Sequence, residues 1–138
     1  MTFSDASCPC IVFALRREAM FFRRMRPRRR PFPGAPIPAA FHGDGPRTVL
    51  LLETGVGIAA MEAALSWLLS GPVVDGVPFR PTALVSAGFS GAIVPGLCVG
   101  DLILADAVGD GDGGSWPATW PVGTRPYPRG RLLTVASL

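Results

Sequence analysis

Residues 83–106 read ALVSAGFSGAIVPGLCVGDLILAD. An apolar strand over 83–86 runs directly into a turn of small residues, and a second apolar strand follows over 102–108. Glycine at the end of a strand lets the backbone approach a ligand closely. In open α/β sheets, ligands bind at the carboxyl ends of the strands. The stretch therefore predicts an α/β fold with a small-molecule site beside Gly88 and Gly91.

The rest of the chain alternates strand-like and helix-like segments. Apolar runs and helical spacing predict strands over 11–14, 48–53, 83–86, 102–108 and 131–135, a short strand near 39–42, and helices over 15–26 and 58–69. This order indicates an α/β sandwich. The helix over 58–69 is apolar almost all round, which predicts burial or a subunit interface. The segments 27–46 and 109–130 are rich in proline and glycine, so we expect loops there.

Composition limits the class of protein. The chain has 138 residues, 49% of them hydrophobic and 17% charged, so we expect at most one globular domain. The net charge is +3, and eight of the thirteen arginines lie between Arg16 and Arg30. Such clusters can bind phosphates or nucleic acid. Because the cluster lacks an aromatic interleaving pattern and a recognisable nucleic-acid module, we interpret it as a solvated helix face and a basic loop, with no nucleic-acid partner.

The cysteines and the histidine do not form a metal-binding pattern. Cys8 and Cys10 make a C-x-C pair, but a zinc site needs about four ligands, and His42 is far away in sequence. We expect no metal, no cofactor, and reduced thiols as in the cytoplasm. The apolar stretch 48–69 contains acidic residues such as Glu53, so we expect no membrane span.

Glu18 is the first candidate for chemistry. The apolar face of the expected first helix carries Leu15, Ala19, Phe22 and Met25. Glu18 falls at the margin of this face, in the first turn, and has no basic partner three or four positions on. A carboxylate beside apolar side chains suits general acid–base work, whereas an acid in a first turn also stabilises the helix dipole. The spacing leaves both interpretations open.

A second candidate is the turn Thr54-Gly55-Val56-Gly57, which joins a strand to a helix. Its N–H groups and the helix N-terminus could hold an anion or a ribose hydroxyl. The glycines together with Ala60 also fit the dinucleotide fingerprint G-x-G-x-x-A, with Asp75 about twenty residues on. Asp75 does not end a convincing strand, so a dinucleotide-binding domain is the weaker alternative.

Four motifs together resemble one family. They are V-F-A-L-x-x-E at 12–18, L-x-x-T-G-V-G at 51–57, S-A-G-F-S-G-A at 86–92 and V-G-D-L-I-L-A-D at 99–106. Their order and spacing are similar to those of the nucleoside phosphorylase superfamily, in the branch of methylthioadenosine/S-adenosylhomocysteine nucleosidases and hopanoid-associated phosphorylase-like proteins. The resemblance covers most of residues 10–108, which we expect to form the core.

The resemblance implies a three-layer α/β/α sandwich around a mixed central sheet. It also implies cleavage of the N-glycosidic bond of a purine-type nucleoside, as in purine salvage. In the nucleosidases a glutamate at the position of Glu18 activates the attacking water. The implied substrate-binding residues lie in two turns and are Thr54, Gly55, Gly57, Ala87, Gly88, Phe89, Ser90 and Gly91.

Two kinds of departure from the family pattern matter. Many phosphorylases have an arginine where this chain has Ser86 and a phosphate-binding serine where it has Phe89. Phosphate needs charge-assisted donors, so the substitutions favour hydrolysis over phosphorolysis. The family's ribose-binding Met-Glu segment and base-protonating aspartate follow a strand resembling 131–135. We therefore expect residues 1–138 to be a partial, C-terminally truncated domain with little or no activity of its own.

A different class of function stays open beside this one. The apolar helix over 58–69 and an unfinished sheet edge also fit a non-catalytic nucleoside-binding or assembly module. Such a module could be a homo-oligomer or could be completed by a second polypeptide that supplies the C-terminal half.

Overall fold

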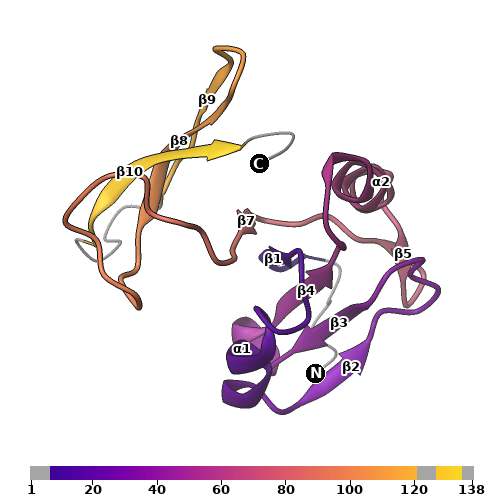
Figure 1. Ribbon diagram of the computed structural model, residues 1–138. Helices are drawn as coiled ribbons and strands as arrows, with labels where there is room; N and C mark the ends of the chain where they lie inside the picture. Colours follow the sequence, from indigo (N-terminus) through magenta and orange to yellow (C-terminus); the bar gives the residue numbers. More distant parts are fainter. Residues whose placement is uncertain (1–6, 121–126, 135–138) are drawn as a thin grey trace. The chain divides into compact units, whose positions relative to one another are not determined.

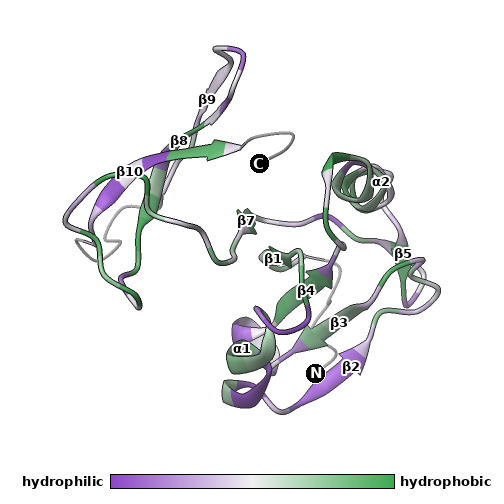
Figure 2. Ribbon diagram, viewed as in Figure 1, coloured by the Kyte–Doolittle hydropathy of each residue, from purple (hydrophilic) through white to green (hydrophobic). Residues whose placement is uncertain are grey.

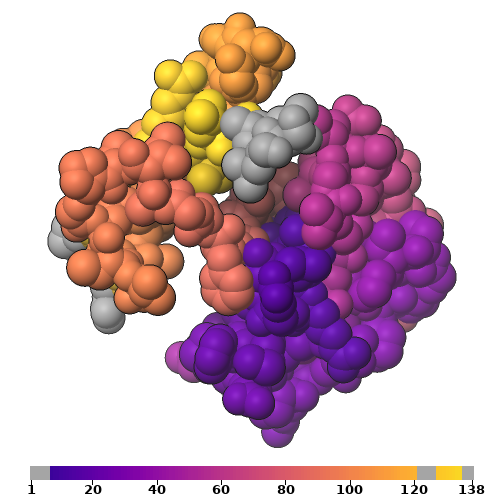
Figure 3. All heavy atoms as spheres, in the orientation of Figure 1, coloured from indigo at the N-terminus to yellow at the C-terminus, as the bar shows by residue number. Residues whose placement is uncertain are grey.

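The computed structural model describes residues 7–120 and 127–134 (Figure 1). The chain divides into two compact units, Met1–Ser90 and Gly91–Leu138. Figure 3 shows their atoms as spheres, the first unit from indigo through magenta and the second in orange and yellow. The expectation of one partial domain over 1–138 stays a prediction.

The first unit is built on a five-stranded mixed sheet with the order β2-β3-β4-β1-β7. Its strands are β1 (Cys10–Phe13), β2 (Arg29–Pro31), β3 (Ala39–His42), β4 (Val49–Glu53) and β7 (Leu84–Ser86). β1 runs parallel to both β4 and β7, whereas β3 is antiparallel to β2 and β4. The carboxyl ends of β4, β1 and β7 therefore meet at one edge of the sheet, and the α/β class with a mixed sheet is confirmed.

Helices α1 (Met20–Met25) and α2 (Ile58–Leu69) cover opposite faces of this sheet. Side chains alternate between the two faces of a strand. Leu50 and Leu52 of β4 therefore pack in the cluster that includes Leu68 of α2, while Leu51 packs with Ala19 beside α1. The result is a three-layer α/β/α sandwich, as expected.

The second helix has the bounds that the sequence predicts. Gly71, at φ 77°, takes the left-handed conformation that commonly ends a helix. Burial is more limited than predicted, because only Ala64 and Leu68 are buried, whereas Ile58 and Leu69 are 63% and 61% exposed. One face of α2 is therefore buried against the sheet of its own unit. The prediction that the rest of the helix lies at a subunit interface stays a prediction.

The first helix is shorter than predicted. It begins at Met20 rather than at position 15, and the residues before it form turns. The Glu18 carboxylate accepts a hydrogen bond from the Leu15 N–H, and the Glu18 N–H donates to the Leu15 carbonyl. These contacts close a turn that replaces the first helical turns. The predicted apolar face is wrong at Met25, which is 74% exposed.

In segment 27–46, which we expect to be a loop with a short strand near 39–42, the short strand is confirmed as β3, and β2 is an additional strand. All three residues of β2 are exposed, and Figure 2 shows it as a mostly hydrophilic strand beside the hydrophobic β3 and β4. Charged residues on an edge strand discourage pairing with another chain. A separate hairpin joins β5 (Val73–Val74) to β6 (Val77–Pro78).

The second unit contains a three-stranded sheet with the order β10-β8-β9. Its strands are β8 (Leu104–Asp110), β9 (Ser115–Pro117) and β10 (Arg129–Thr134). β9 and the start of β10 lie within 109–130, where we expect a loop. β9 was missed because it is a short, exposed strand without an apolar run, and the start of β10 because its partner β8 is distant in sequence. Position 135 of the predicted last strand lies outside the described residues. Leu104 is the only buried hydrophobic residue in the described part of this unit.

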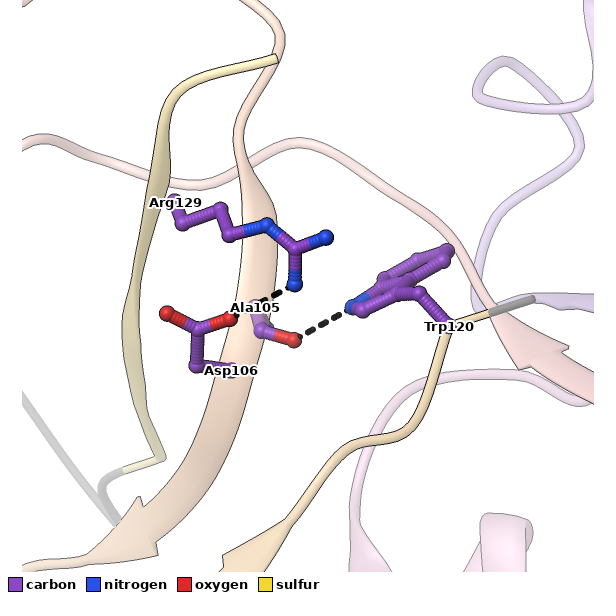
Figure 4. A network of polar contacts seen from close by, with 4 residues as sticks. All are labelled: Ala105, Asp106, Trp120 and Arg129. Carbon is purple, nitrogen blue, oxygen red and sulfur yellow. Dashed lines mark hydrogen bonds and ion pairs between the residues drawn. The ribbon is translucent and has the colours of Figure 1, made fainter. Parts of the chain in front are cut away.

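Side-chain hydrogen bonds and an ion pair stabilise the strands and turns of the second unit. The Trp120 indole N–H donates to the Ala105 carbonyl at 2.8 Å, and Arg129 of β10 pairs with Asp106 of β8 at 3.0 Å (Figure 4). The Asp101 carboxylate accepts a hydrogen bond from the Cys98 N–H at 2.7 Å, so it fixes the turn that precedes the strand. Across the described residues, no helix is long and apolar enough to cross a membrane.

Candidate functional site

Hydrogen bonds connect the ends of the three parallel strands. The Thr54 N–H donates to the Phe13 carbonyl at 3.0 Å, just after β4 and at the end of β1. The Ala87 N–H, just after β7, donates to the Val12 carbonyl at 2.9 Å. The turns that begin at positions 14, 54 and 87 are therefore neighbours at one edge of the sheet.

Glu18 connects two of these turns. Its Oε2 accepts a hydrogen bond from the Leu15 N–H at 2.9 Å, and its Oε1 accepts one from the Phe89 N–H at 3.1 Å. A side chain at Gly88 would meet this carboxylate, because an added Cβ would lie 3.0 Å from Oε1. The glycine after β7 therefore allows the backbone to approach Glu18.

This bonding pattern has a chemical consequence. Acceptance of two N–H bonds is typical of an ionised carboxylate, and each oxygen keeps further acceptor capacity. Glu18 is half-buried, so solvent still reaches it. The side chain can therefore hold a water molecule and accept a proton from it.

The turn after β4 contains two glycines, whose backbone carries no side chain. Gly55 and Gly57 have φ of 85° and 100°, which side chains rarely tolerate. Thr54 is buried, and its hydroxyl donates to the Gly55 carbonyl at 3.0 Å. This hydrogen bond fixes the start of the turn, and both glycines remain exposed.

The other residues of the implied pocket differ in how far they are exposed to solvent. Ala87 is half-buried, whereas Phe89 is 70% exposed and Ser90 is also exposed. Gly91 belongs to the second unit, so its relation to Glu18 stays a prediction.

An ion pair behind the site was not predicted from the sequence. Arg23 Nη2 of α1 lies 2.5 Å from Glu53 Oε1 at the end of β4, and the Glu53 side chain is only 9% exposed. We interpreted the arginine cluster that includes Arg23 as a solvated helix face, but the Arg23 side chain is only 21% exposed. Glu53 gave the available signal, because a carboxylate on a buried strand needs a partner.

The structure does not support the alternative of a dinucleotide-binding domain. Asp75 lies in the tight turn of the β5–β6 hairpin, at φ 50°, with Gly76 at φ 82°. The fingerprint requires the acidic residue to end the next strand of the same parallel sheet.

Within the described ranges, no three His, Cys, Asp or Glu side chains lie close enough together to bind a metal ion.

The mixed sheet, with a carboxylate and glycine turns at the ends of its parallel strands, defines an α/β protein, and that edge is its candidate small-molecule site. A sequence model described as the phosphorylase superfamily matches residues 12–136. This match covers most of the chain, which therefore belongs to the phosphorylase superfamily. No curated protein matches the sequence significantly.

The fold is similar to solved nucleosidase structures at low sequence identity. The 5′-methylthioadenosine/S-adenosylhomocysteine nucleosidase of S. pneumoniae, bound to a transition-state inhibitor, superposes with a TM-score of 0.70 at 15% identity, over 95% of this chain and 65% of that one. The Neisseria meningitidis enzyme gives 0.66 at 13%, over 94% and 64%. The Streptococcus pyogenes S-adenosylhomocysteine nucleosidase gives 0.67 at 14%, over 99% and 66%. This chain thus spans about 65% of their length.

Proposed function

We propose that this chain carries the water-activating part of a nucleoside-cleaving site, with Glu18 as the general base. The observation that carries the proposal is the contact between Glu18 and the Phe89 backbone, at the edge where β4, β1 and β7 end. Membership in the phosphorylase superfamily and the likeness to nucleosidases support it. The proposed substrate is a purine-type nucleoside.

The proposed reaction is hydrolysis of the N-glycosidic bond. The bond breaks with an oxocarbenium-like transition state, and its electron pair leaves with the base. A water molecule held by Glu18 attacks the anomeric carbon and passes one proton to the carboxylate. The departing base gains a proton, so the sum is the addition of one water. The exposed glycines of the turns at 54–57 and 87–91 would form the pocket walls around the ribose and the base.

Hydrolysis is favoured over phosphorolysis by two side chains. Ser86 is the last residue of β7 and Phe89 lies in the turn after it. A phosphate there would need charge-assisted donors, and neither side chain carries charge. We also expect the 138 residues to be weakly active, because about a third of the length of the similar nucleosidases has no counterpart in this chain.

The test measures release of adenine from methylthioadenosine by the purified chain, with and without phosphate. We expect slow release that does not require phosphate and that falls by about 10²–10⁴ in Glu18→Gln, the usual contribution of general acid–base catalysis. Glu62→Gln is the matched control, because Glu62 is exposed on α2. Unchanged release in Glu18→Gln would exclude Glu18 as the base, and phosphate-dependent release would assign the site to phosphorolysis.

If release lies below detection, ligand binding replaces it as the readout. Methylthioadenosine should then raise the melting temperature of the intact chain, and the rise should shrink in Glu18→Gln but persist in Glu62→Gln. A ligand that shifts neither protein would overturn the proposal of a nucleoside site.

A non-catalytic assembly module is the second candidate, and one observation favours it. β7 is an edge strand of the first unit's sheet, with Leu84 47% exposed, and α2 leaves Ile58 and Leu69 exposed. Such surfaces can pair with a second copy or with another polypeptide. A monodisperse monomer in light scattering at high concentration would rule out the homo-oligomer.

A further inference from the structure

An arginine-lined hollow lies at the opposite end of β4 from Glu18. It has a volume of about 360 Å³, and its lining includes Arg28, Arg29, Arg30, Phe41, Asp44 and Thr48. Thr48 precedes β4 and Thr54 follows it, so the hollow is separated from the candidate nucleoside site by the length of that strand. We call this site the arginine hollow.

The charge of the arginine hollow is positive. Its lining has three arginines and one acid, Asp44, whose Oδ2 accepts a hydrogen bond from Arg28 Nη1 at 2.6 Å. Arg30 lies over the Phe41 ring, 4.8 Å from its centroid, and is 3.5 Å from Asp75. Arg29 has neither an ion pair nor a hydrogen-bonded side chain among the residues that the structure describes, so its charge is available to a ligand.

Hydrogen bonds to backbone carbonyls hold the loop that borders the hollow in place. The Gly43 N–H donates to the Arg28 carbonyl at 3.2 Å, and Arg26 Nη1 donates to the Arg47 carbonyl at 2.7 Å. Packing here is close, because a Cβ at Gly43 would lie 2.8 Å from the Arg47 carbonyl oxygen. The hollow is therefore formed before any ligand arrives, which lowers the entropic cost of binding.

Size and chemistry define the class of ligand. A volume of about 360 Å³ lies at the lower end of the range for small-molecule sites. Guanidinium groups match phosphate oxygens in geometry and charge. Nucleic acid would need a continuous basic track, and here Asp44 and Asp75 flank the arginines. We propose that the arginine hollow binds a small phosphate-bearing anion, with Arg29 as the main charged donor.

The test uses inorganic pyrophosphate and the full chain in isothermal titration calorimetry. We expect saturable binding with a stoichiometry of one, weakened about tenfold in Arg29→Gln, the size of effect of one charged hydrogen bond. Arg24→Gln is the matched control, because Arg24 is exposed on α1 and does not line the hollow. It should leave the affinity within about twofold of the parent value.

A second variant keeps the test independent of folding defects. Asp44→Asn removes the one acid of the lining and should tighten pyrophosphate binding several-fold, a gain that a damaged structure would not produce. Amide resonances of Gly43 and Thr48 should shift on titration, whereas that of Phe89 should not.

Three results would overturn the proposal. One is the absence of saturable pyrophosphate binding by the parent chain. Another is an equal loss of affinity in Arg24→Gln and Arg29→Gln, which would indicate diffuse charge. The third is much tighter binding of a single-stranded oligonucleotide than of pyrophosphate, with a steep salt dependence, which would assign the arginines to nucleic acid. None of these outcomes bears on Glu18, so the nucleoside site is tested separately.

Discussion

Arg23 of α1 and Glu53 of β4 form an ion pair, with Nη2 and Oε1 2.5 Å apart. Glu53 directly precedes the turn that begins at Thr54, and Arg23 lies in α1, which follows the turn that contains Glu18. The pair therefore fixes the segment that carries Glu18 to the strand that carries the glycine turn. Its low exposure, 21% for Arg23 and 9% for Glu53, makes an unpaired partner costly.

The first prediction is that Glu53→Gln destabilises the protein. Removal of one partner of a fully buried pair costs about 3–5 kcal/mol, and the partial exposure of Arg23 lowers our expectation to about 1–3 kcal/mol. Urea denaturation followed by circular dichroism measures this free energy of unfolding. Glu62→Gln, the same substitution on the exposed face of α2, should change it by less than about 0.5 kcal/mol. Equal effects of the two substitutions would show that the ion pair contributes nothing.

The second prediction concerns Gly88. In Gly88→Ala the new Cβ would stand 3.0 Å from Glu18 Oε1, so the carboxylate must move and its bond to the Phe89 N–H should weaken. We expect the Phe89 amide to exchange with solvent at least about fivefold faster, the equivalent of about 1 kcal/mol. Gly111→Ala is the control, since a Cβ there meets open space. Unchanged exchange at Phe89 would disprove the steric explanation.

The third prediction separates the cysteines by reactivity. Burial raises the pKa of the Cys10 thiol to about 12 and also raises that of Cys8, whereas Cys98 is exposed. Because the thiolate is the reactive form, a disulfide reagent at pH 8 should label one thiol quickly in the folded protein and all three in urea. Cys98→Ser should abolish the fast reaction. Rapid labelling of a second thiol would contradict the burial of Cys8 and Cys10.

The same pKa shift has a consequence for stability at alkaline pH. The pKa of Cys10 is about 12 in the folded protein and 9.0 in an unfolded chain, so the unfolded state loses its proton first. The stabilisation is therefore complete below pH 9 and is lost as the pH rises toward 12. A Cys10→Ala variant should show a weaker decline of unfolding free energy over this window than the parent protein.

The fourth prediction compares two contacts of the second unit. Asp106 and Arg129 are about half exposed, so Asp106→Asn should change the free energy of unfolding by less than about 0.5 kcal/mol. Trp120→Phe removes the hydrogen bond to the Ala105 carbonyl and should cost about 1 kcal/mol. Thermal unfolding of both variants gives the comparison. A larger loss in Asp106→Asn would reverse this order of importance.

Local signals in the sequence predict several elements well. The bounds of α2 follow from a long apolar helical pattern between Gly57 and Gly71, and β4 follows from an apolar run that ends before Gly55. β2 and β9 were missed because each is only three residues long, fully exposed and without an apolar run, so neither shows the pattern of a buried strand. The start of α1 was wrong because the Glu18 side chain bonds to its own turn. Helical periodicity carries no information about such a bond.

The order of apolar runs and glycine turns was sufficient to indicate an α/β sandwich, a ligand edge and the family. It also singled out Glu18 and the turns at 54–57 and 86–92. The tertiary structure decided which of these segments meet, because parallel pairing of β1 with β4 and β7 brings their carboxyl ends together. It also decided the partner of Arg23 and brought Arg29 into the lining of the arginine hollow, since the surroundings of a charged side chain depend on residues far away in sequence. Periodicity reports which face a residue occupies, and only packing reports what lies opposite.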